Sequence, residues 1–460
     1  MTIIRVIFAL FLIYTWFYIL QWIVGILISI NTLSRTAWKK TWVKLSLPTK
    51  LAKRHTVSAI IAAYNEEACV TDTIDSLLEE DYRHLEIILV DDGSTDRMAE
   101  EVFDRYSLEF SRDLTNLISD DAENARCYEQ IINGRKLVFL QKNNGGKAHA
   151  LNCGLKLSTG RYCMVLDADT KVSRGSVRMM VSQFLADRKT VVCAGVVGND
   201  DIMHTDLPLL QRALVAFQTL EYYRTFYMQR ILLDKINANI VVSGAFAMFD
   251  GELLRAIGGY RENTIGEDME LSMRLHAFCQ SQNRPYKIAF IPYAKCTTQF
   301  PFSYRDFARQ RRRWQIGMIQ SLLEHRYMLV SHHYGWAGLF SGTLFLVYEL
   351  FAPFIELLGV VTLVAAYFMG ILDIVSVSAI LLAYYGLMII MQAILIFSLN
   401  VYGVEKIPLK RQLFLLTVAC MEFITFHLIH SAVKVAAIVT YRKYRKTWQH
   451  IRRSREMALK

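Results

Sequence analysis

The sequence lacks the cysteine patterns that mark a disulfide framework or a zinc site. Its eight cysteines include no Cys-x-x-Cys pair and show no regular spacing, so neither feature is expected. Seven of the eight fall in the middle of the chain, which we expect to be cytoplasmic, so they should stay reduced. The glycine-rich stretch 143–147 also lacks the Gly-x4-Gly-Lys-Ser/Thr spacing and is therefore not a Walker loop.

No small-residue cleavage site follows the first apolar segment, residues 3–30, which is long enough to cross a bilayer. We therefore expect a membrane anchor rather than a removed signal peptide. Hydrophobic residues make up 53% of the 460 positions, and the mean hydropathy of +0.24 is high for a soluble enzyme. Apolar sequence dominates again at 341–433, which predicts further spans, whereas residues 57–330 have the composition of a globular domain.

The sequence leaves the number of C-terminal crossings open. Apolar stretches cover about 340–370, 375–399 and 412–436. Three crossings would place the basic tail outside the cell, against the positive-inside rule. Acidic residues and a proline interrupt the first stretch, which suggests a kinked or interfacial element, and an even number of crossings is favoured.

Basic residues outnumber acidic ones by 52 to 42, giving a net charge of +10. The excess follows the first span and fills the C-terminal tail, which indicates cytoplasmic placement and contact with anionic membrane lipids. Because this charge tracks the membrane boundaries, nucleic acid is not an expected partner. The expected units are an N-terminal anchor (1–33), a basic linker (34–56), a globular domain (57–302), a basic interface helix region (303–336), membrane helices (337–440) and a basic cytoplasmic tail (441–460).

Short apolar strands alternate with longer amphipathic segments in the globular part. This alternation predicts an α/β fold whose mostly parallel sheet is covered on both faces. Ligands of such sheets bind outside the carboxyl ends of the strands. Strands are expected at 57–63, 85–90, 137–141 and 162–166, and helices at 66–79 and 149–157.

Three other segments of the globular part have their own patterns. Residues 100–135 are polar and helical in pattern, and we expect a peripheral insertion without chemistry. Two basic, aromatic-rich helices are expected at 209–235 and 304–327, which suits the bilayer interface. For the first of them, a helix in the domain core is an equally good interpretation.

Carboxylates follow two of the predicted strands. Asp167 and Asp169 lie two residues apart, so both can face one hard divalent cation such as Mg²⁺, which binds one or two carboxylates plus substrate phosphates. Asp92 reaches the same edge of the sheet and is expected to bond a base or ribose. The alternatives are a surface turn for the pair, and a helix N-cap by Ser94 or Asp96 for the second cluster.

Two further positions suggest phosphate and proton chemistry. Lys147 precedes a helix, where it can contact phosphate together with helix-terminal amides; a plain turn lysine is the alternative. Asp268 is the best candidate for a general base, a role that typically contributes ~10²–10⁴-fold. Its neighbour Glu267 can raise its pKa by like-charge repulsion. Acids that complement a helix dipole are the alternative there.

The segment Gln310-Arg311-Arg312-Arg313-Trp314 combines three kinds of side chain. The arginines can neutralise a leaving diphosphate, Trp314 offers a flat face to a sugar ring, and Gln310 offers an amide for hydrogen bonds. A basic interface helix would explain the arginines but not the flanking glutamine and tryptophan.

Seven short motifs occur in order along the chain: Ala63-Tyr64-Asn65-Glu66, Asp91-Asp92-Gly93-Ser94, Asn144-Gly145-Gly146-Lys147, Asp167-Ala168-Asp169, Ser243-Gly244-Ala245-Phe246, Gly266-Glu267-Asp268 and Gln310–Trp314. Together they resemble the motifs of the processive family 2 glycosyltransferases, which include cellulose, hyaluronan and poly-N-acetylglucosamine synthases. The resemblance covers residues 57–330, and apolar segments flank it on both sides, as in that family.

The resemblance implies a cytoplasmic GT-A domain that uses a UDP-sugar with Mg²⁺ or Mn²⁺. It also implies a single inverting displacement that gives a β-linkage, and an exit for the polymer through the membrane helices. The implied contacts are Tyr64, Glu66 and Asp92 to the nucleoside, Lys147 and Arg313 to the diphosphate, Asp167 and Asp169 to nucleotide and metal, Asp268 as the base, Ser243 and Gly244 at the acceptor, and Gln310 and Trp314 on the terminal sugar.

The single N-terminal span and the modest size look most like the poly-β-1,6-N-acetylglucosamine synthases of bacterial biofilms. The expected donor is then UDP-N-acetylglucosamine, the acceptor is a growing polysaccharide, and the site is a bacterial cell membrane, where a small partner subunit would fit. A counterpart of the regulatory domain of bacterial cellulose synthases and a gating-loop motif after Trp314 are not evident. The alternatives are transfer of one sugar to a lipid and a degenerate translocation component; Gln310–Trp314 argues against the first and the intact acids against the second.

Overall fold

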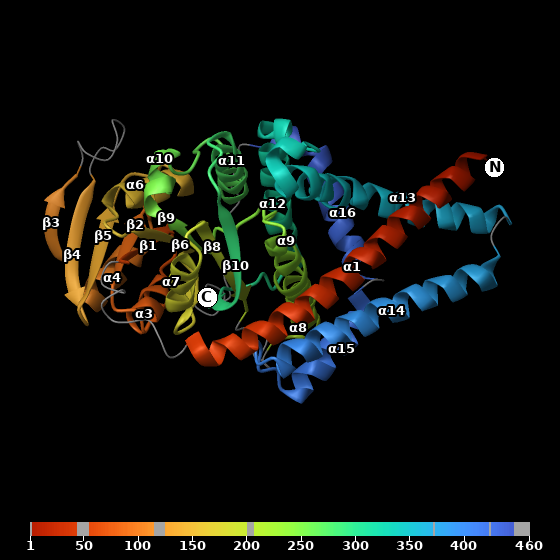
Figure 1. Ribbon diagram of the computed structural model, residues 1–460, viewed down its shortest axis with the longest axis horizontal. Coiled ribbons are helices and arrows are strands. Elements are labelled where there is room, and N and C mark those ends of the chain that lie inside the picture. Colours follow the sequence, from red (N-terminus) through yellow and green to blue (C-terminus); the bar gives the residue numbers. More distant parts are fainter. Residues whose placement is uncertain are drawn as a thin grey trace.

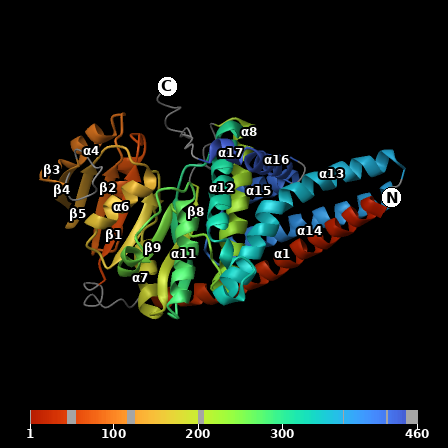
Figure 2. The same ribbon diagram turned by 90° about the horizontal axis from the view of Figure 1, so that it is seen from above.

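The computed structural model describes residues 2–43, 55–114, 125–199, 207–370, 373–422 and 425–445. Figure 1 shows a sheet domain at one end and long helices that project from it at the other. The helices α1 (Thr2–Val43), α13 (Ala352–Phe368) and α14 (Ile374–Val401) form this projection, and the N-terminus lies near its far end. The same division is clear from above in Figure 2.

Within the described residues, the domain is built on one ten-stranded sheet in the order β3-β4-β5-β2-β1-β6-β9-β8-β10-β7. The pairings make β3, β5, β2, β1, β6, β8 and β10 run one way and β4, β9 and β7 the other. The predicted α/β fold with a mostly parallel sheet is therefore confirmed. The strands are β1 (Val57–Ala63), β2 (Leu85–Asp91), β3 (Glu109–Asp113), β4 (Arg126–Ile132), β5 (Arg135–Gln141), β6 (Tyr162–Asp167), β7 (Lys171–Val172), β8 (Thr190–Gly198), β9 (Phe246–Asp250) and β10 (Lys287–Thr297).

Helices pack against this sheet along the chain order expected for β-α-β units. Helix α6 (Lys147–Leu157) packs on β1 and β2, and α7 (Ser176–Ala186) packs on β8 and β10. Helix α3 (Val70–Leu78) contacts β7 and α4 (Met98–Tyr106). The predicted strands and helices of this part are thus found within a few residues of their expected bounds.

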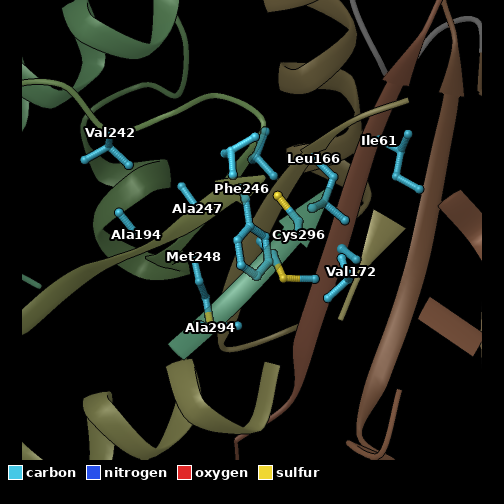
Figure 3. Close-up of a cluster of buried hydrophobic side chains, with 14 of the residues drawn as sticks. Ile61, Leu166, Val172, Ala194, Val242, Phe246, Ala247, Met248, Ala294 and Cys296 are labelled. Carbon is cyan, nitrogen blue, oxygen red and sulfur yellow. The ribbon is translucent and has the colours of Figure 1, made fainter. Parts of the chain in front are cut away.

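The core of the domain is continuous from the parallel strands into the antiparallel β9. Figure 3 shows Phe246 of β9 among apolar side chains of neighbouring strands. Gly195 of β8 makes room for this ring, because a Cβ there would lie 2.3 Å from a Phe246 ring carbon. Burial of such strands on both faces explains why they are almost wholly apolar in sequence.

The expectation of a helical insertion at 100–135 is wrong for most of its described part. Helix α4 ends at Tyr106, and β3 and β4 then form an antiparallel extension of the sheet edge. Every residue of β3 is exposed, so the segment has no buried face and therefore no alternating pattern to reveal a strand. Residues 115–124 lie outside the described residues.

Helix α1 continues past the expected anchor boundary at residue 33 and ends at Val43. Residues 34–43 of the predicted linker are therefore helical, while residues 44–54 lie outside the described part. Among the described residues, three helices are long and apolar enough to cross a membrane, at Ile13–Thr36, Ala337–Phe368 and Val377–Val401. Two of the predicted C-terminal stretches thus correspond to long helices.

The third C-terminal stretch is not one straight span. Helices α15 (Leu409–Glu422) and α16 (Phe426–Val439) are bent by 59° relative to each other. The short helix α17 (Tyr441–Tyr444) follows them, and the predicted tail from residue 446 on lies outside the described residues. The predicted even number of crossings stays a prediction.

Two further helices separate the sheet from the membrane helices. Helix α8 (Leu209–Arg224) continues through the π-helical segment η2 (Thr225–Arg230) into α9 (Ile231–Lys235), as predicted for 209–235. Helix α12 (Tyr304–Glu324) begins with a Ser303 side chain that accepts the Asp306 amide. Phe217 of α8 is buried and stacks on Phe426 of α16, with ring centroids 4.8 Å apart. Helix α8 is therefore enclosed between the domain and the C-terminal helices.

Candidate active site

The carboxylates after β2 and β6 meet at one edge of the sheet. In the register of the parallel strands, Ala63 of β1 is paired with Asp91 and Ala62 with Asp167. The two acidic motifs therefore flank the same end of β1, as expected for ligand-binding residues of a parallel sheet. Tyr64, the first residue after β1, is exposed at this edge.

Asp92 is buried and holds the loop before α6. One carboxylate oxygen, Oδ1, accepts the Gly145 amide at 2.9 Å and pairs with the ammonium of Lys142, and Oδ2 accepts the Gly146 amide at 2.8 Å. The expected contact of Asp92 with a nucleoside stays a prediction. The carboxylate already orients the glycine loop, and Lys142 is a site residue that sequence reasoning missed.

Gly93 explains how this loop can approach so closely. Its backbone has φ +76°, and a Cβ there would lie 2.7 Å from the amide nitrogen of Asn144. A side chain would therefore be strained and would push the loop away. The loop carries the chain into α6, whose first residue is Lys147.

Lys147 joins two of the predicted acidic motifs. Its ammonium lies 2.7 Å from Oδ1 of Asp167 and 2.9 Å from Oε1 of Glu267. Burial lowers the pKa of Lys147, but the two carboxylates outweigh burial and raise it well above its usual value. Lys147 therefore stays positively charged at the sheet edge, where it can bind an anionic group.

Asp268 lies directly beside this ion cluster. Its carboxylate accepts the Gly244 amide at 3.1 Å and the Met269 amide at 2.8 Å. Burial and the neighbouring Glu267 raise the pKa of Asp268, while Lys147 and the two amides oppose the rise. A raised pKa suits a carboxylate that must take up a proton.

Gly244 connects the predicted acceptor motif with Asp268, the predicted base. A Cβ at this position would lie 3.3 Å from Cβ of Asp268 and 3.4 Å from Nζ of Lys147. Ser243 precedes it and is half-buried, and its hydroxyl accepts the Ala245 amide at 3.4 Å. Gly244 therefore lies beside Asp268 and Lys147, and the acceptor contact implied by the motif stays a prediction.

Arg230, at the end of η2, is a second cation near Asp268. Its guanidinium donates to the carbonyl of Val241. Burial lowers the pKa of Arg230 to about 10, while the charges of Asp268 and Glu349 oppose this. Sequence reasoning missed Arg230 as a site residue. Nothing in the sequence distinguishes it from the other arginines of this basic helix.

Asp169 lies two residues after the end of β6 and contacts the segment that follows β10. It is 5% exposed, and its Oδ2 accepts the hydroxyl of Thr298 at 2.7 Å. The segment after β10 then leads to Phe300, whose ring lies 4.4 Å from that of Tyr222 on α8. Tyr222 in turn lies 6.5 Å from the indole of Trp314. The predicted metal-binding motif and Trp314 are thus linked through one aromatic cluster.

A cavity of about 260 Å³ borders this aromatic cluster between the ends of β8 and β10, helix α8 and the segment before α15. Tyr222 and Phe300 both line it. Neither Asp169 nor Trp314 is among its lining residues.

The Gln310–Trp314 segment lies in the middle of α12. Trp314 is 41% exposed, and the amide oxygen of Gln310 is buried without a hydrogen-bond partner among the described residues. Arg313 is half-buried between Arg312 and Trp314. The amide oxygen of Gln310 and the exposed part of the Trp314 ring are therefore available for contacts with a ligand.

The expectation that Arg311 neutralises a diphosphate conflicts with its position. Arg311 is 5% exposed and forms two bonds of 2.9 and 2.8 Å with the carboxylate of Glu221 on α8. Arg312 lies with its guanidinium carbon 4.7 Å from the ring centre of Tyr444. For Arg313, contact with the diphosphate stays a prediction.

Glu66 is half-buried, and the thiol of Cys69 donates to its Oε2 at 3.1 Å.

No group of three His, Cys, Asp or Glu side chains in the described part of the chain is arranged to hold a metal by itself. The pair Asp167 and Asp169 suits a cation that takes its other ligands from substrate phosphates and water. The predicted Mg²⁺ or Mn²⁺ site fits the residues present in this sense.

The fold is that of an α/β protein of the GT-A type, with helices among the described residues that are long and apolar enough to cross a membrane. A mannosyltransferase from Pyrobaculum calidifontis, solved in complex with GDP-Man and Mn²⁺, has the same fold, with a TM-score of 0.52 and 20% identity over 84% of this chain and 99% of that one. The family model "Glycosyl transferase family group 2" matches residues 162–402, and "Glycosyl transferase family 2" matches 58–112. The protein belongs to the family 2 glycosyltransferases, as its motifs indicated.

Curated relatives narrow the comparison. The chain is 30% identical over 268 residues to the poly-β-1,6-N-acetyl-D-glucosamine synthase of Staphylococcus epidermidis, which covers 58% of this chain and 55% of the relative. It is 29% identical over 267 residues to the synthase of the same name from Staphylococcus aureus. The matched region thus spans about half the length of these relatives.

Proposed function

We propose that the protein is an inverting glycosyltransferase that polymerises UDP-N-acetylglucosamine into a β-linked exopolysaccharide. The observation that carries this proposal is the contact of Lys147 with both Asp167 and Glu267, directly beside Asp268. In this proposal Lys147 is the cation that binds the diphosphate, Asp167 belongs to the metal-binding motif, and Asp268, whose pKa is raised, is the base. The names of the staphylococcal relatives support the choice of sugar.

In the proposed reaction, the chain's residues bind the donor and prepare the acceptor. Lys147 and Arg313 bind the diphosphate, and Lys147 exchanges its present carboxylate partners for phosphate oxygens. Tyr64 and Glu66 contact the nucleoside, while Asp92 acts by holding the glycine loop. A divalent cation held by Asp167 and Asp169 would stabilise charge on the leaving diphosphate.

Asp268 then removes the proton from the acceptor hydroxyl as that oxygen attacks the anomeric carbon. The bond from the anomeric carbon to the diphosphate breaks on the opposite face, so the configuration inverts and UDP leaves. Ser243 and Gly244 border the acceptor, and Gln310 and Trp314 hold its terminal sugar. Holding the chain terminus in this way is what repeated transfer to one acceptor requires.

We also propose that the catalytic domain lies on the cytoplasmic side and that the polymer leaves through the membrane helices. The basic residues after the first span support this orientation. Between these helices, Tyr14 of α1 donates to Glu356 of α13 at 3.0 Å, and Ser431 of α16 donates to the same carboxylate at 2.5 Å. Polar groups at such depth are costly and commonly mark a substrate path.

The test uses the full-length protein in detergent with a panel of radiolabelled UDP-sugars and Mg²⁺ or Mn²⁺. The expected result is UDP release and a ladder of products from UDP-N-acetylglucosamine, sensitive to a β-1,6-specific hexosaminidase. A single labelled sugar on lipid would show the non-processive alternative instead. Absence of UDP release from every donor would refute the proposal.

A further inference from the structure

The guanidinium of Arg311 lies between two aromatic rings of its own helix. Its central carbon is 4.4 Å from the ring centre of Trp314 and 5.0 Å from that of Phe307. Stacking on aromatic faces is a favourable geometry for arginine, because the group is flat, charged and weakly hydrated. One face of the Trp314 indole is thus supported by Arg311, and the ring keeps 41% of its surface exposed.

Glu221 fixes this guanidinium from a different helix. Its two oxygens accept separate nitrogens of Arg311 at 2.9 and 2.8 Å, so the pair is bidentate. A bidentate pair fixes the plane of the guanidinium as well as its position. The orientation of the plane beneath Trp314 is therefore set by α8, where Glu221 lies.

We propose that Glu221 is a positioning residue that holds the sugar-stacking face of Trp314 through Arg311. The proposal deepens the proposed function and rests on it. Without the carboxylate, Arg311 would be a buried cation lacking its partner, and it would leave the indole for another acid or for water. Trp314 would then lose the surface that supports it, and the acceptor would lose a fixed platform.

The proposal assigns Glu221 an effect on the acceptor and not on the donor. The donor cluster around Lys147 makes no contact with Glu221 among the interactions of the described residues. A weakened platform should therefore raise the KM for acceptor and shorten the products, because the chain end dissociates more often between transfers. A purely structural role would instead lower stability and affect both substrates alike.

The first experiment compares Glu221→Gln with Asp234→Asn in the full-length protein in detergent. Asp234 is a matched control because its ion pair with Lys287 has a carboxylate side chain of similar exposure, 21% against 20% for Glu221. With a β-1,6-linked N-acetylglucosamine oligosaccharide as acceptor, Glu221→Gln is expected to raise the acceptor KM several-fold and shorten the products. The KM for UDP-N-acetylglucosamine is expected to stay within twofold, and Asp234→Asn to change neither KM.

A charge swap distinguishes a positioning role of Glu221 from a role that only holds α8 and α12 together. The double variant Glu221→Arg with Arg311→Glu restores an ion pair but puts a carboxylate under the indole. It should recover the melting temperature lost by Glu221→Arg alone, while the acceptor KM stays high. Recovery of both would overturn the proposal. Arg311→Lys, which keeps the charge but loses the planar fork, should also raise the acceptor KM, and an unchanged value would equally overturn the proposal.

The outcomes also distinguish this proposal from the proposed function. A wild-type protein that releases no UDP from any donor would refute the transferase itself. Normal UDP release and polymer length in Glu221→Gln, with unchanged acceptor KM, would refute only the positioning role of Glu221.

Discussion

Gly266 and Gly317 touch backbone to backbone, where the acidic motif at the start of α11 (Glu267–Ser281) meets the arginine-tryptophan helix α12. A Cβ on Gly266 would lie 2.7 Å from the carbonyl carbon of Gly317, and one on Gly317 would lie 2.7 Å from Cα of Gly266. Ser321, one turn further along α12, donates to the carbonyl of Gly266 at 3.3 Å. This contact fixes the base at the start of α11 relative to Trp314, three residues before Gly317.

Gly317→Ala should therefore separate the base from the acceptor platform. Neither backbone can yield locally, so the added methyl should destabilise the protein by about 1–3 kcal/mol and lower polymer formation. Gly386→Ala in α14 is the control, because no atom lies within 4 Å of its added Cβ. Thermal unfolding and product yield should change in the first variant alone. Wild-type behaviour of Gly317→Ala would show that the close contact is unimportant.

Glu267→Gln should shift the pH dependence of the transfer rate. Burial raises the pKa of Asp268 first, and the charge of Glu267 raises it further. Because the base must be deprotonated to act, the rate should rise with pH above the range of an ordinary aspartate. Removal of the Glu267 charge lowers the pKa of Asp268 and should move this acid limb to lower pH. A limb that stays in place would mean that another group titrates.

Glu80 should make the stability of the domain depend on pH. Its carboxylate accepts the amides of Gly175 and Val177 at the start of α7, and burial raises its pKa from 4.5 to about 7. A raised folded-state pKa favours folding while the group is protonated, so this contribution is full below about pH 4.5 and is lost as pH rises through about 7. The loss amounts to at most about 3 kcal/mol.

Melting temperatures of the wild type and of Glu80→Gln between pH 5 and pH 8 test this assignment. The glutamine cannot titrate. Its side-chain NH2 group would face one of the two backbone amides that Glu80 binds, and that amide would lose its acceptor. The variant should therefore be less stable overall but vary less with pH than the wild type. Parallel curves for the two proteins would show that Glu80 does not titrate in this range.

Trp314→Ala should impair chain extension more than donor binding. The indole is exposed on α12, and Arg311 supports one of its faces, so its removal takes away the platform and leaves the Lys147 cluster intact. Product length and acceptor KM should change, with UDP affinity within about twofold of wild type. Trp336→Ala, at a tryptophan exposed beyond the end of α12, is the control. Unchanged product length in Trp314→Ala would contradict the stacking role.

The sequence was sufficient to predict the sheet edge of the site. Buried strands are recognisable as apolar runs, and each relevant run ends at an aspartate, so Asp91 and Asp167 could be assigned to one edge before their register with β1 was known. The link of Lys147 to Glu267 depends instead on how α11 returns to the sheet. In the sequence, this contact was indicated only because Lys147 and Glu267 both belong to the set of seven motifs.

Other features could not be predicted because they depend on partners distant in sequence. Arg311 has the same composition signal as Arg313, yet Glu221, on another helix, removes it from the set of phosphate ligands. The bonds of Asp92 to Lys142 and to the glycine loop likewise join residues 50 or more positions apart in the chain. The edge strand β3 is exposed along its whole length, so its residues carry no record of burial.

The central claim is that Asp268 removes the acceptor proton in a site whose donor contacts lie elsewhere. Asp268→Asn in the full-length protein, assayed for polymer and for UDP binding with Mn²⁺, tests it most directly; Asp104→Asn, an exposed change on α4, is the control. The predicted result is a loss of polymer formation by roughly 10²–10⁴-fold with UDP affinity retained. Polymer at the wild-type rate, or loss of UDP binding together with activity, would contradict it.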